Sequence, residues 1–308
     1  MFEAFQLGPL LVWTRLVFLL IGIWLFVEFF LRLAQSANLS LQHFQENYAL
    51  YLLAFILGGR LMAILSEYRV YVKDEWLRLF LFTDGNFSFL GSAIGIGVVL
   101  GMVTKGHRST FLHWLDALVP ATTLGLVFAW LGSFFSGQAY GRPTDLPWGV
   151  TYDAFNVRYA VPVHPVQLYY ALFYFLLTFL LLIVRKRAKR VGSETLFGIV
   201  CAALGTFLLE YFRGDFGVPV FATKFDFALI SFIFLMLGIF AAVELSLSQR
   251  MFLFYEFLLV LVCGVYLFLR PFLTLDTVEL RFSQLLALLA LLGTIVYVVV
   301  QRRRYPHL

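Results

Sequence analysis

Long apolar runs, separated by short polar segments or by glycine and proline, make up most of the chain. Each run has close to the roughly 20 residues that an α-helix needs to cross the hydrocarbon core of a bilayer. The pattern therefore predicts an all-α, polytopic integral membrane protein with about nine transmembrane helices. The predicted spans are residues 9–31, 46–66, 86–104, 112–135, 166–184, 194–212, 227–246, 251–272 and 282–300.

Local patterns in three segments refine this prediction. The third span contains the sequence GSAIGIGVVLG, whose small residues allow two helices to approach closely. Residues 69–82 interleave charged and aromatic side chains, which is typical of an amphipathic segment in the membrane interface. The first span follows no basic segment and is too long for the apolar part of a signal peptide, so we expect it to stay in the chain.

The composition is that of a membrane protein and excludes a water-soluble globular domain. Of the 308 residues, 61% are hydrophobic and 13% are charged, whereas soluble domains carry about 25% charged residues. Much of the basic charge behind the formal net charge of +5 lies in one loop and a tail, so we expect no nucleic-acid partner. Cys201 and Cys263 lie in apolar runs without metal-ligand or disulfide spacing, and we expect them to be buried. We expect no metal ion and no cofactor.

Basic residues between the spans predict the orientation in the membrane, because cytoplasmic loops are enriched in Lys and Arg. Five of the six residues in segment 185–190 (RKRAKR) are basic. Lys105, Arg108 and the arginines at 302–304 lie on the same side if about nine spans are present. We therefore expect a cytoplasmic C-terminus, an N-terminus outside, and the loop 137–164 on the outer side.

The long loop 137–164 is punctuated by glycine and proline, which interrupt helices and favour turns. Non-helical backbone at membrane depth is tolerated only where it is buried in protein or lines a watery cavity. We therefore expect this loop to fold back and roof a polar pocket, with Trp148 and Tyr140 as part of an interfacial lid. The loop charges expected to face solvent are Asp145, Asp153 and Arg158.

Charged groups inside or beside the spans mark the candidate site, because a charge within a bilayer needs a partner, water or a function. Arg60, Arg142 and Arg213 are the candidate phospholipid-binding residues, in a cleft near the outer leaflet. Arginine suits this role because its planar guanidinium makes two parallel hydrogen bonds to phosphate. His164 is the candidate catalytic residue, as a proton carrier, because imidazole changes its charge near neutral pH.

A purely structural role is the alternative interpretation of these charges. Arg60 would then pair with Asp116 or Glu210, and Glu210 with Arg213 would form an interfacial ion pair. Gly58 and Gly59, which precede Arg60, would let another backbone come close to this position and favour a functional role there.

Seven motifs occur in a characteristic order: LGPLLVW at 7–13, LGGRL at 57–61, the pattern DG..SF.G...G at 84–95, LDALVP at 115–120, LG.F..G..YGRPTDLPWGV at 131–150, HP.QLYY at 164–170 and EYFR at 210–213. Together they resemble the prolipoprotein diacylglyceryl transferase family over residues 7 to about 245. The resemblance implies a multi-pass protein of the bacterial cytoplasmic (inner) membrane, with a seven-helix body in residues 1–248. Residues 249–308 would add two transmembrane helices and a basic tail.

The resemblance also implies a function: transfer of diacylglyceryl from phosphatidylglycerol to the lipobox cysteine of a lipoprotein precursor. The expected partners are therefore phospholipid, with phosphatidylglycerol foremost, lipoprotein precursors and the membrane. The reaction needs a cation for the phosphoglycerol leaving group and a base for the thiol. The retained residues that the resemblance marks as structural or supporting are Asp116, Gly141, Gln167, Tyr169 and Glu210.

Several positions depart from the family pattern, and some of them are charged in the family. The residues in place of arginine are Trp130, Val163 and Thr206, those in place of glutamate are Gln138 and Tyr170, Leu90 stands in place of histidine, and the other departures are Thr14, Ser92, Ser133 and Ala202. Three functions therefore stay open. They are a transferase with a rearranged site, a different lipid-modifying enzyme, and a non-catalytic paralogue that binds phospholipid or lipoprotein precursors or serves as a subunit of a membrane assembly.

Overall fold

A computed structural model gives the fold, and it describes residues 4–7, 10–66, 88–104, 107–153, 157–187, 191–215, 249–269 and 281–304. Two compact units make up the chain, Met1–Gly198 and Ile199–Leu308. The predicted amphipathic segment 69–82 and the predicted span 227–246 lie outside the described residues. The expected boundary after residue 248 stays a prediction.

A short antiparallel hairpin opens the first unit. Strand β1 (Ala4–Leu7) pairs with β2 (Leu10–Trp13), so that Ala4 faces Trp13 and Leu7 faces Leu10. Helix α1 (Thr14–Ser36) follows directly. The predicted start of the first span at residue 9 is therefore wrong, because residues 10–13 satisfy their backbone groups in a strand ladder rather than in a helix.

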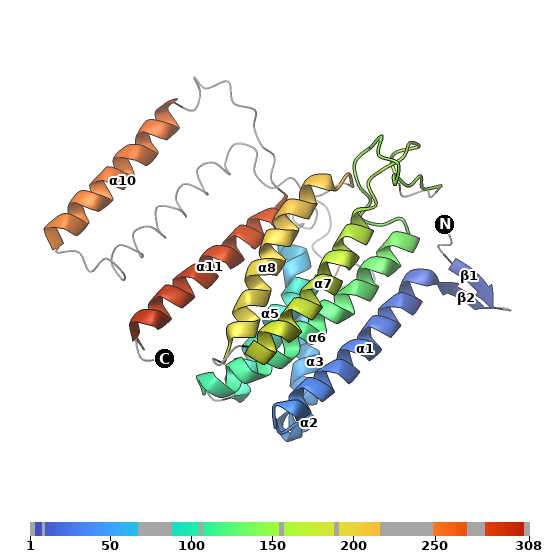
Figure 1. Cartoon of the computed structure of the whole chain (residues 1–308), viewed down its shortest axis with the longest axis horizontal. Helices are drawn as coiled ribbons and strands as arrows, with labels where there is room; N and C mark the ends of the chain where they lie inside the picture. Colours follow the sequence, from blue (N-terminus) through green and yellow to red (C-terminus); the bar gives the residue numbers. More distant parts are fainter. Residues whose placement is uncertain are drawn as a thin grey trace. The chain divides into compact units, whose positions relative to one another are not determined.

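The other regular elements described in the first unit are helices. Its further helices are α2 (Gln42–Glu46), α3 (Tyr48–Ser66), α5 (Phe89–Val103), α6 (Arg108–Phe135), α7 (Val166–Arg187) and the first turns of α8 (Ser193–Leu209). Helix α1 packs on α6, α3 on α5, and α6 on α7 (Figure 1). Apart from the hairpin, the predicted all-α architecture is confirmed.

The predicted close approach through small residues is confirmed between α3 and α5. A Cβ atom added at Gly58 would overlap the Gly91 carbonyl, and one at Gly91 would overlap the Gly58 carbonyl. Helices α1 and α6 cross in a similar way, where a Cβ at Gly22 would lie 2.9 Å from the carbonyl oxygen of Gly125. These helices therefore meet backbone to backbone, as small residues permit in membrane proteins.

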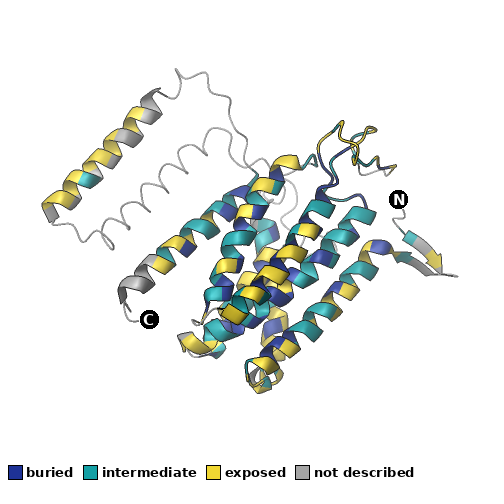
Figure 2. Ribbon diagram, viewed as in Figure 1, coloured by how far each residue is buried: buried dark blue, intermediate teal, exposed yellow. Residues whose placement is uncertain are grey.

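Burial along the helices follows the helical period. On α7 the buried residues recur every three to four positions, from Gln167 through Tyr170 and Tyr174 to Leu181, while Leu172 and Phe179 on the other side are exposed (Figure 2). Exposed large apolar side chains on such helices suit contact with lipid. Among the described residues, four helices are long and apolar enough to cross a membrane: Thr14–Ser36, Ser109–Phe135, Val166–Arg187 and Ser193–Phe212.

The second unit contains the end of α8, a 3-10 turn at Glu210–Phe212, and two further helices. These are α10 (Gln249–Leu269) and α11 (Phe282–Arg304), which coincide with the last two predicted spans. Within the described part of the chain, a helix therefore stands at every predicted span, and the protein is a multi-pass membrane protein.

Candidate functional site

The loop between α6 and α7 is an ordered frame built by backbone hydrogen bonds. Val150 and Val163 exchange two N–H···O bonds of 3.0 Å each, and the amide of Thr144 donates to the carbonyl of Pro162 over 2.9 Å. Val163 is fully buried and packs with the buried rings of Tyr140 and Tyr152. The loop therefore folds back on itself, and its expected place as the roof of a polar pocket stays a prediction.

Gly141 is clamped against His164, which brings two of the family-like motifs into contact. A Cβ at position 141 would overlap the carbonyl of His164 and would lie 2.6 Å from its Cβ. The amide of His164 donates to the carbonyl of Arg142 over 2.9 Å. Only glycine fits at position 141 without displacing His164, and the supporting role of this residue in the site stays a prediction.

His164, Tyr169 and Trp148 form a hydrogen-bonded row at the head of α7. The indole Nε1 of Trp148 donates to the Tyr169 hydroxyl over 2.8 Å, and that hydroxyl lies 3.3 Å from Nδ1 of His164. Indole nitrogen can only donate, so the Tyr169 oxygen accepts there, and it can also accept from a protonated Nδ1 of His164, which leaves Nε2 of the neutral ring free to take up a proton. Burial lowers the pKa of His164, so the neutral imidazole prevails at neutral pH.

Gln167 fastens the loop to α7 from inside. The side chain is fully buried, and its amide nitrogen donates to the carbonyl of Gln138 over 2.7 Å. Its Oε1 accepts a 3.4 Å hydrogen bond from the Tyr152 hydroxyl. Burial raises the pKa of Tyr152 to about 12 against the opposing effect of this bond, so the phenol stays a neutral donor. Gln167 therefore ties the loop to the head of α7 through these two hydrogen bonds.

Two positions that carry charge in the resembled family face each other as aromatic rings. Trp130 on α6 and Tyr170 on α7 stack with ring centroids 4.1 Å apart and planes 5° from parallel. The Tyr174 ring continues the stack at 6.2 Å. An expected arginine and an expected glutamate are thus replaced together, by a pair that stabilises itself through ring contact.

The candidate basic residues of the first unit occupy different surroundings. Arg60 is buried on α3, within the close helix crossing at Gly58. Arg142 has an exposed side chain in the loop, while its backbone is held by His164. The expected convergence of these side chains with Arg213 on one cleft stays a prediction.

Asp116 lies toward the other end of α6 from the loop and fastens the N-terminus of α8. Its carboxylate accepts from the amides of Gly192 at 2.6 Å and Thr195 at 2.9 Å, and from the Thr195 hydroxyl at 2.6 Å. Such bonds satisfy amide groups that have no partner within the helix, and a negative charge suits a helix N-terminus. Asp116 therefore has a supporting role.

Arg185, which the sequence indicates only as an orienting charge, joins three helices at the same end. Its guanidinium donates to the carbonyls of Leu33 at 3.0 Å and Asp116 at 3.3 Å, and lies 3.5 Å from Glu194. Leu33 is in the last turn of α1, whose carbonyls lack helical partners. Periodicity could not reveal this role, because the partners are 9 to 152 residues away.

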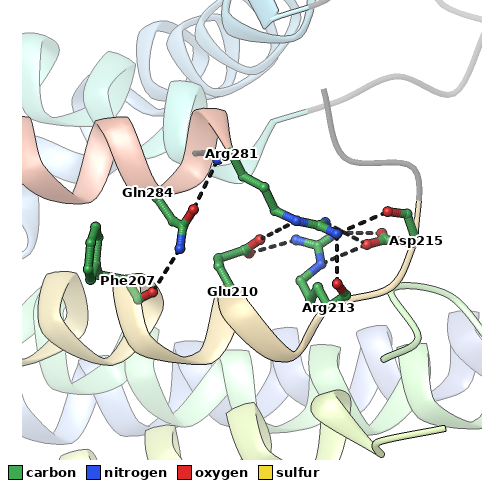
Figure 3. A network of polar contacts seen from close by, with 6 residues as sticks. All are labelled: Phe207, Glu210, Arg213, Asp215, Arg281 and Gln284. Carbon is green, nitrogen blue, oxygen red and sulfur yellow. Dashed lines mark hydrogen bonds and ion pairs between the residues drawn. The ribbon is translucent and has the colours of Figure 1, made fainter. Parts of the chain in front are cut away.

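In the second unit, Glu210 and Arg213 form the predicted ion pair, with Nη1 of Arg213 2.7 Å from Oε1 of Glu210. Asp215 and Arg281 complete a four-residue cluster, to which Gln284 is attached (Figure 3). None of the seven motifs contains Asp215, Arg281 or Gln284. Among the described residues, the structure contains no group of three or more His, Cys, Asp or Glu that could hold a metal ion.

Comparison with known proteins gives a consistent result. The profile of the prolipoprotein diacylglyceryl transferase family matches residues 3–244. Three relatives bear the name phosphatidylglycerol–prolipoprotein diacylglyceryl transferase. The relative from Geobacter sulfurreducens is 34% identical over 194 residues (62% of this chain, 74% of the relative), that from Polynucleobacter necessarius 35% over 162 (52% and 61%), and that from Tropheryma whipplei 30% over 224 (68% and 80%). The chain thus spans less than two thirds of the Polynucleobacter protein.

Proposed function

Because the chain belongs to the prolipoprotein diacylglyceryl transferase family, we propose that it transfers diacylglyceryl from phosphatidylglycerol to the cysteine thiol of a prolipoprotein. The observation that carries this proposal is the frame that holds His164 against Gly141 and Tyr169. This frame fixes an ionisable, largely neutral imidazole at the edge of the membrane-spanning helices, next to the exposed Arg142.

The proposed reaction exchanges one bond for another at a glyceryl carbon. The thiol gives its proton to His164, the sulfur forms a C–S bond to the diacylglyceryl CH₂ group, and the C–O bond to phosphate breaks. Phosphoglycerol leaves with the electron pair. Arg142, Arg60 and Arg213 are the proposed ligands of the phosphate charge, which grows as the bond breaks. A lowered pKa suits His164 as a base, since the neutral ring is the form that accepts a proton.

A non-catalytic phospholipid-binding protein is the second candidate, and the Trp130–Tyr170 stack favours it. Positive charge aimed at the leaving group is commonly the largest contribution to such catalysis, and losing one donor costs about 10²–10³ in rate. Two stacked rings supply no such charge. This candidate retains binding of phosphatidylglycerol, through Arg60 and Arg142, without turnover.

The proposed orientation follows from Lys and Arg at the helix ends. Arg185, Lys186 and Arg187 end α7, and we place this end in the cytoplasm of a bacterium. The loop with His164 then faces the outer side of the inner membrane. Cysteine labelling tests this orientation: a cysteine introduced at Asp145 should react with an impermeant reagent in spheroplasts, and one at Lys186 should not.

Complementation tests the proposed reaction. The full chain is expressed in a bacterium depleted of its own transferase, and the lipidation of a reporter lipoprotein is read by mass. We expect the diacylglyceryl mass on the cysteine with the natural chain and its loss with His164→Gln. Unmodified reporter despite normal membrane levels, together with retained binding of phosphatidylglycerol vesicles, would establish the second candidate. Turnover of another headgroup or acceptor would indicate a different lipid-modifying enzyme.

A further inference from the structure

The charged cluster at the end of α8 draws one of its members from far along the chain. Arg213 contacts Glu210 at 2.7 Å and Asp215 at 2.5 Å. Arg281 reaches the same two carboxylates, with Nη1 2.8 Å from Asp215 and Nε 3.8 Å from Glu210 (Figure 3). It also donates to the backbone carbonyls of Arg213 at 2.8 Å and Asp215 at 3.0 Å. Arg281 therefore holds both the backbone and the side chains of the EYFR segment.

Residue 281 lies outside residues 3–244, which match the family profile. It directly precedes α11, and Gln284 in the first turn accepts from the Arg281 amide over 3.0 Å. The side-chain nitrogen of Gln284 donates to the carbonyl of Phe207, in the last turn of α8, over 3.1 Å. The side chain of Gln284 thus caps the N-terminus of α11 and donates to a carbonyl in the last turn of α8. These two bonds fix the position of Arg281 relative to α8.

The four charges of the cluster balance. Glu210 and Asp215 carry two negative charges, and Arg213 and Arg281 carry two positive charges. All four side chains are largely buried, with 3–20% of their surface exposed. Burial by itself would raise the pKa of Asp215, but hydrogen bonds and Coulombic attraction from Arg213 and Arg281 outweigh it and leave the pKa below its usual value. Arg281 supplies one of the two positive charges among these four described residues, so its removal would leave this group with one net negative charge.

We propose that Arg281 is a positioning residue for the phospholipid substrate: it neutralises Asp215 and Glu210, which would otherwise repel the lipid phosphate and compete with it for Arg213. This inference rests on the proposed function of the chain, in which Arg213 meets the phosphate. It gives the start of α11, which lies beyond the family-matched residues 3–244, a part in substrate recognition. The cation comes from a residue that no family motif of the chain contains.

The test uses the full chain, purified and reconstituted in phosphatidylcholine vesicles with graded amounts of phosphatidylglycerol and a lipobox peptide as acceptor. Arg281→Gln leaves one net negative charge, and we expect about a tenfold rise in KM for phosphatidylglycerol with kcat within about twofold of the natural chain. The double variant Arg281→Gln/Asp215→Asn is neutral again and should restore KM. Asp215→Asn alone leaves one positive charge and should lower KM, while Arg281→Lys should retain most of the natural KM.

A merely structural role for Arg281 gives a different result. Arg281→Gln would then lower the amount of folded protein or the Tm, and KM of the folded fraction would not change. An unchanged KM in Arg281→Gln overturns the proposal, as does a KM that stays high in the neutral double variant. A higher KM in Asp215→Asn alone also contradicts it.

Failure of the proposed function is distinguishable from failure of this inference. If the natural chain transfers nothing to the peptide, the transferase proposal fails, and the inference is then read from binding to phosphatidylglycerol vesicles against phosphatidylcholine vesicles. A roughly tenfold loss of that preference in Arg281→Gln, restored in the double variant, supports a role for Arg281 without turnover. An equal preference for phosphatidylglycerol in the natural chain, Arg281→Gln and the double variant overturns the inference.

Discussion

Replacing Trp130 with arginine and Tyr170 with glutamate puts a charge at each position of the stack. We expect the effects of these two changes on stability to be strongly coupled. In Tyr170→Glu alone, a carboxylate replaces a ring that is 1% exposed, and an uncompensated buried charge costs about 3–5 kcal/mol. The ring centroids are 4.1 Å apart. At that spacing an arginine and a glutamate attract each other by about 4 kcal/mol with an effective dielectric constant of about 20. The variant Trp130→Arg/Tyr170→Glu should therefore be more stable than the sum of its single changes by about 2–4 kcal/mol.

Unfolding of the four proteins in mixed detergent micelles measures this coupling, and transfer to a lipobox peptide measures its effect on function. We expect the double variant to gain about tenfold to a hundredfold in lipidation rate, since it returns one cation to the site. The stack-preserving variant Trp130→Phe/Tyr170→Phe controls for changes in ring size and should gain nothing. If the stability changes of the two single variants add up to that of the double variant, the idea that these positions face each other as a pair is refuted.

Three further predictions concern the frame of the loop and its anchorage. Gly141→Ala should destabilise the chain by about 1–3 kcal/mol in detergent unfolding, because the new methyl group displaces His164; a stable variant with full lipidation would contradict the clamp. The lowered pKa of His164 means that the folded chain binds this proton less tightly than the unfolded chain, so stability should fall as pH drops below 6.5. Lipidation should also fall as pH drops. If the stability of His164→Gln falls with pH at the same slope as that of the natural chain, His164 is not the cause. Asp116→Ala should lower the stability by about 0.5–2 kcal/mol per lost cap, and Thr195→Val should reproduce only part of that loss because its amide still donates.

The sequence predicted those features that depend on local pattern. Glu210 and Arg213 are three residues apart, close enough for adjacent side chains to pair, and the structure pairs them. The helices were predictable because each must satisfy its backbone groups within one apolar run. The hairpin was missed because its apolar strands read like the start of a helix. Arg281 could not be paired with Asp215 from the sequence, since 66 residues separate them and no period connects them.

Charge is redistributed in this chain in two physically different ways. At Trp130 and Tyr170, both members of an expected charged pair are aromatic, so neither leaves a partner uncompensated, and the layer is stabilised by stacking.

At Glu210, the expected arginine one turn earlier is Thr206, yet the carboxylate keeps two guanidinium neighbours, Arg213 and Arg281. A buried carboxylate must have such partners, and here Arg213 makes the close contact at 2.7 Å while Arg281, 3.8 Å away, adds a second positive charge. The frame around His164 depends on backbone bonds and on Gly141, which the replacements at Trp130, Tyr170 and Thr206 do not touch. The loop can therefore keep its family form while the charges that serve the reaction change, and for this reason lipidation has to be measured in the Trp130 and Arg281 variants separately.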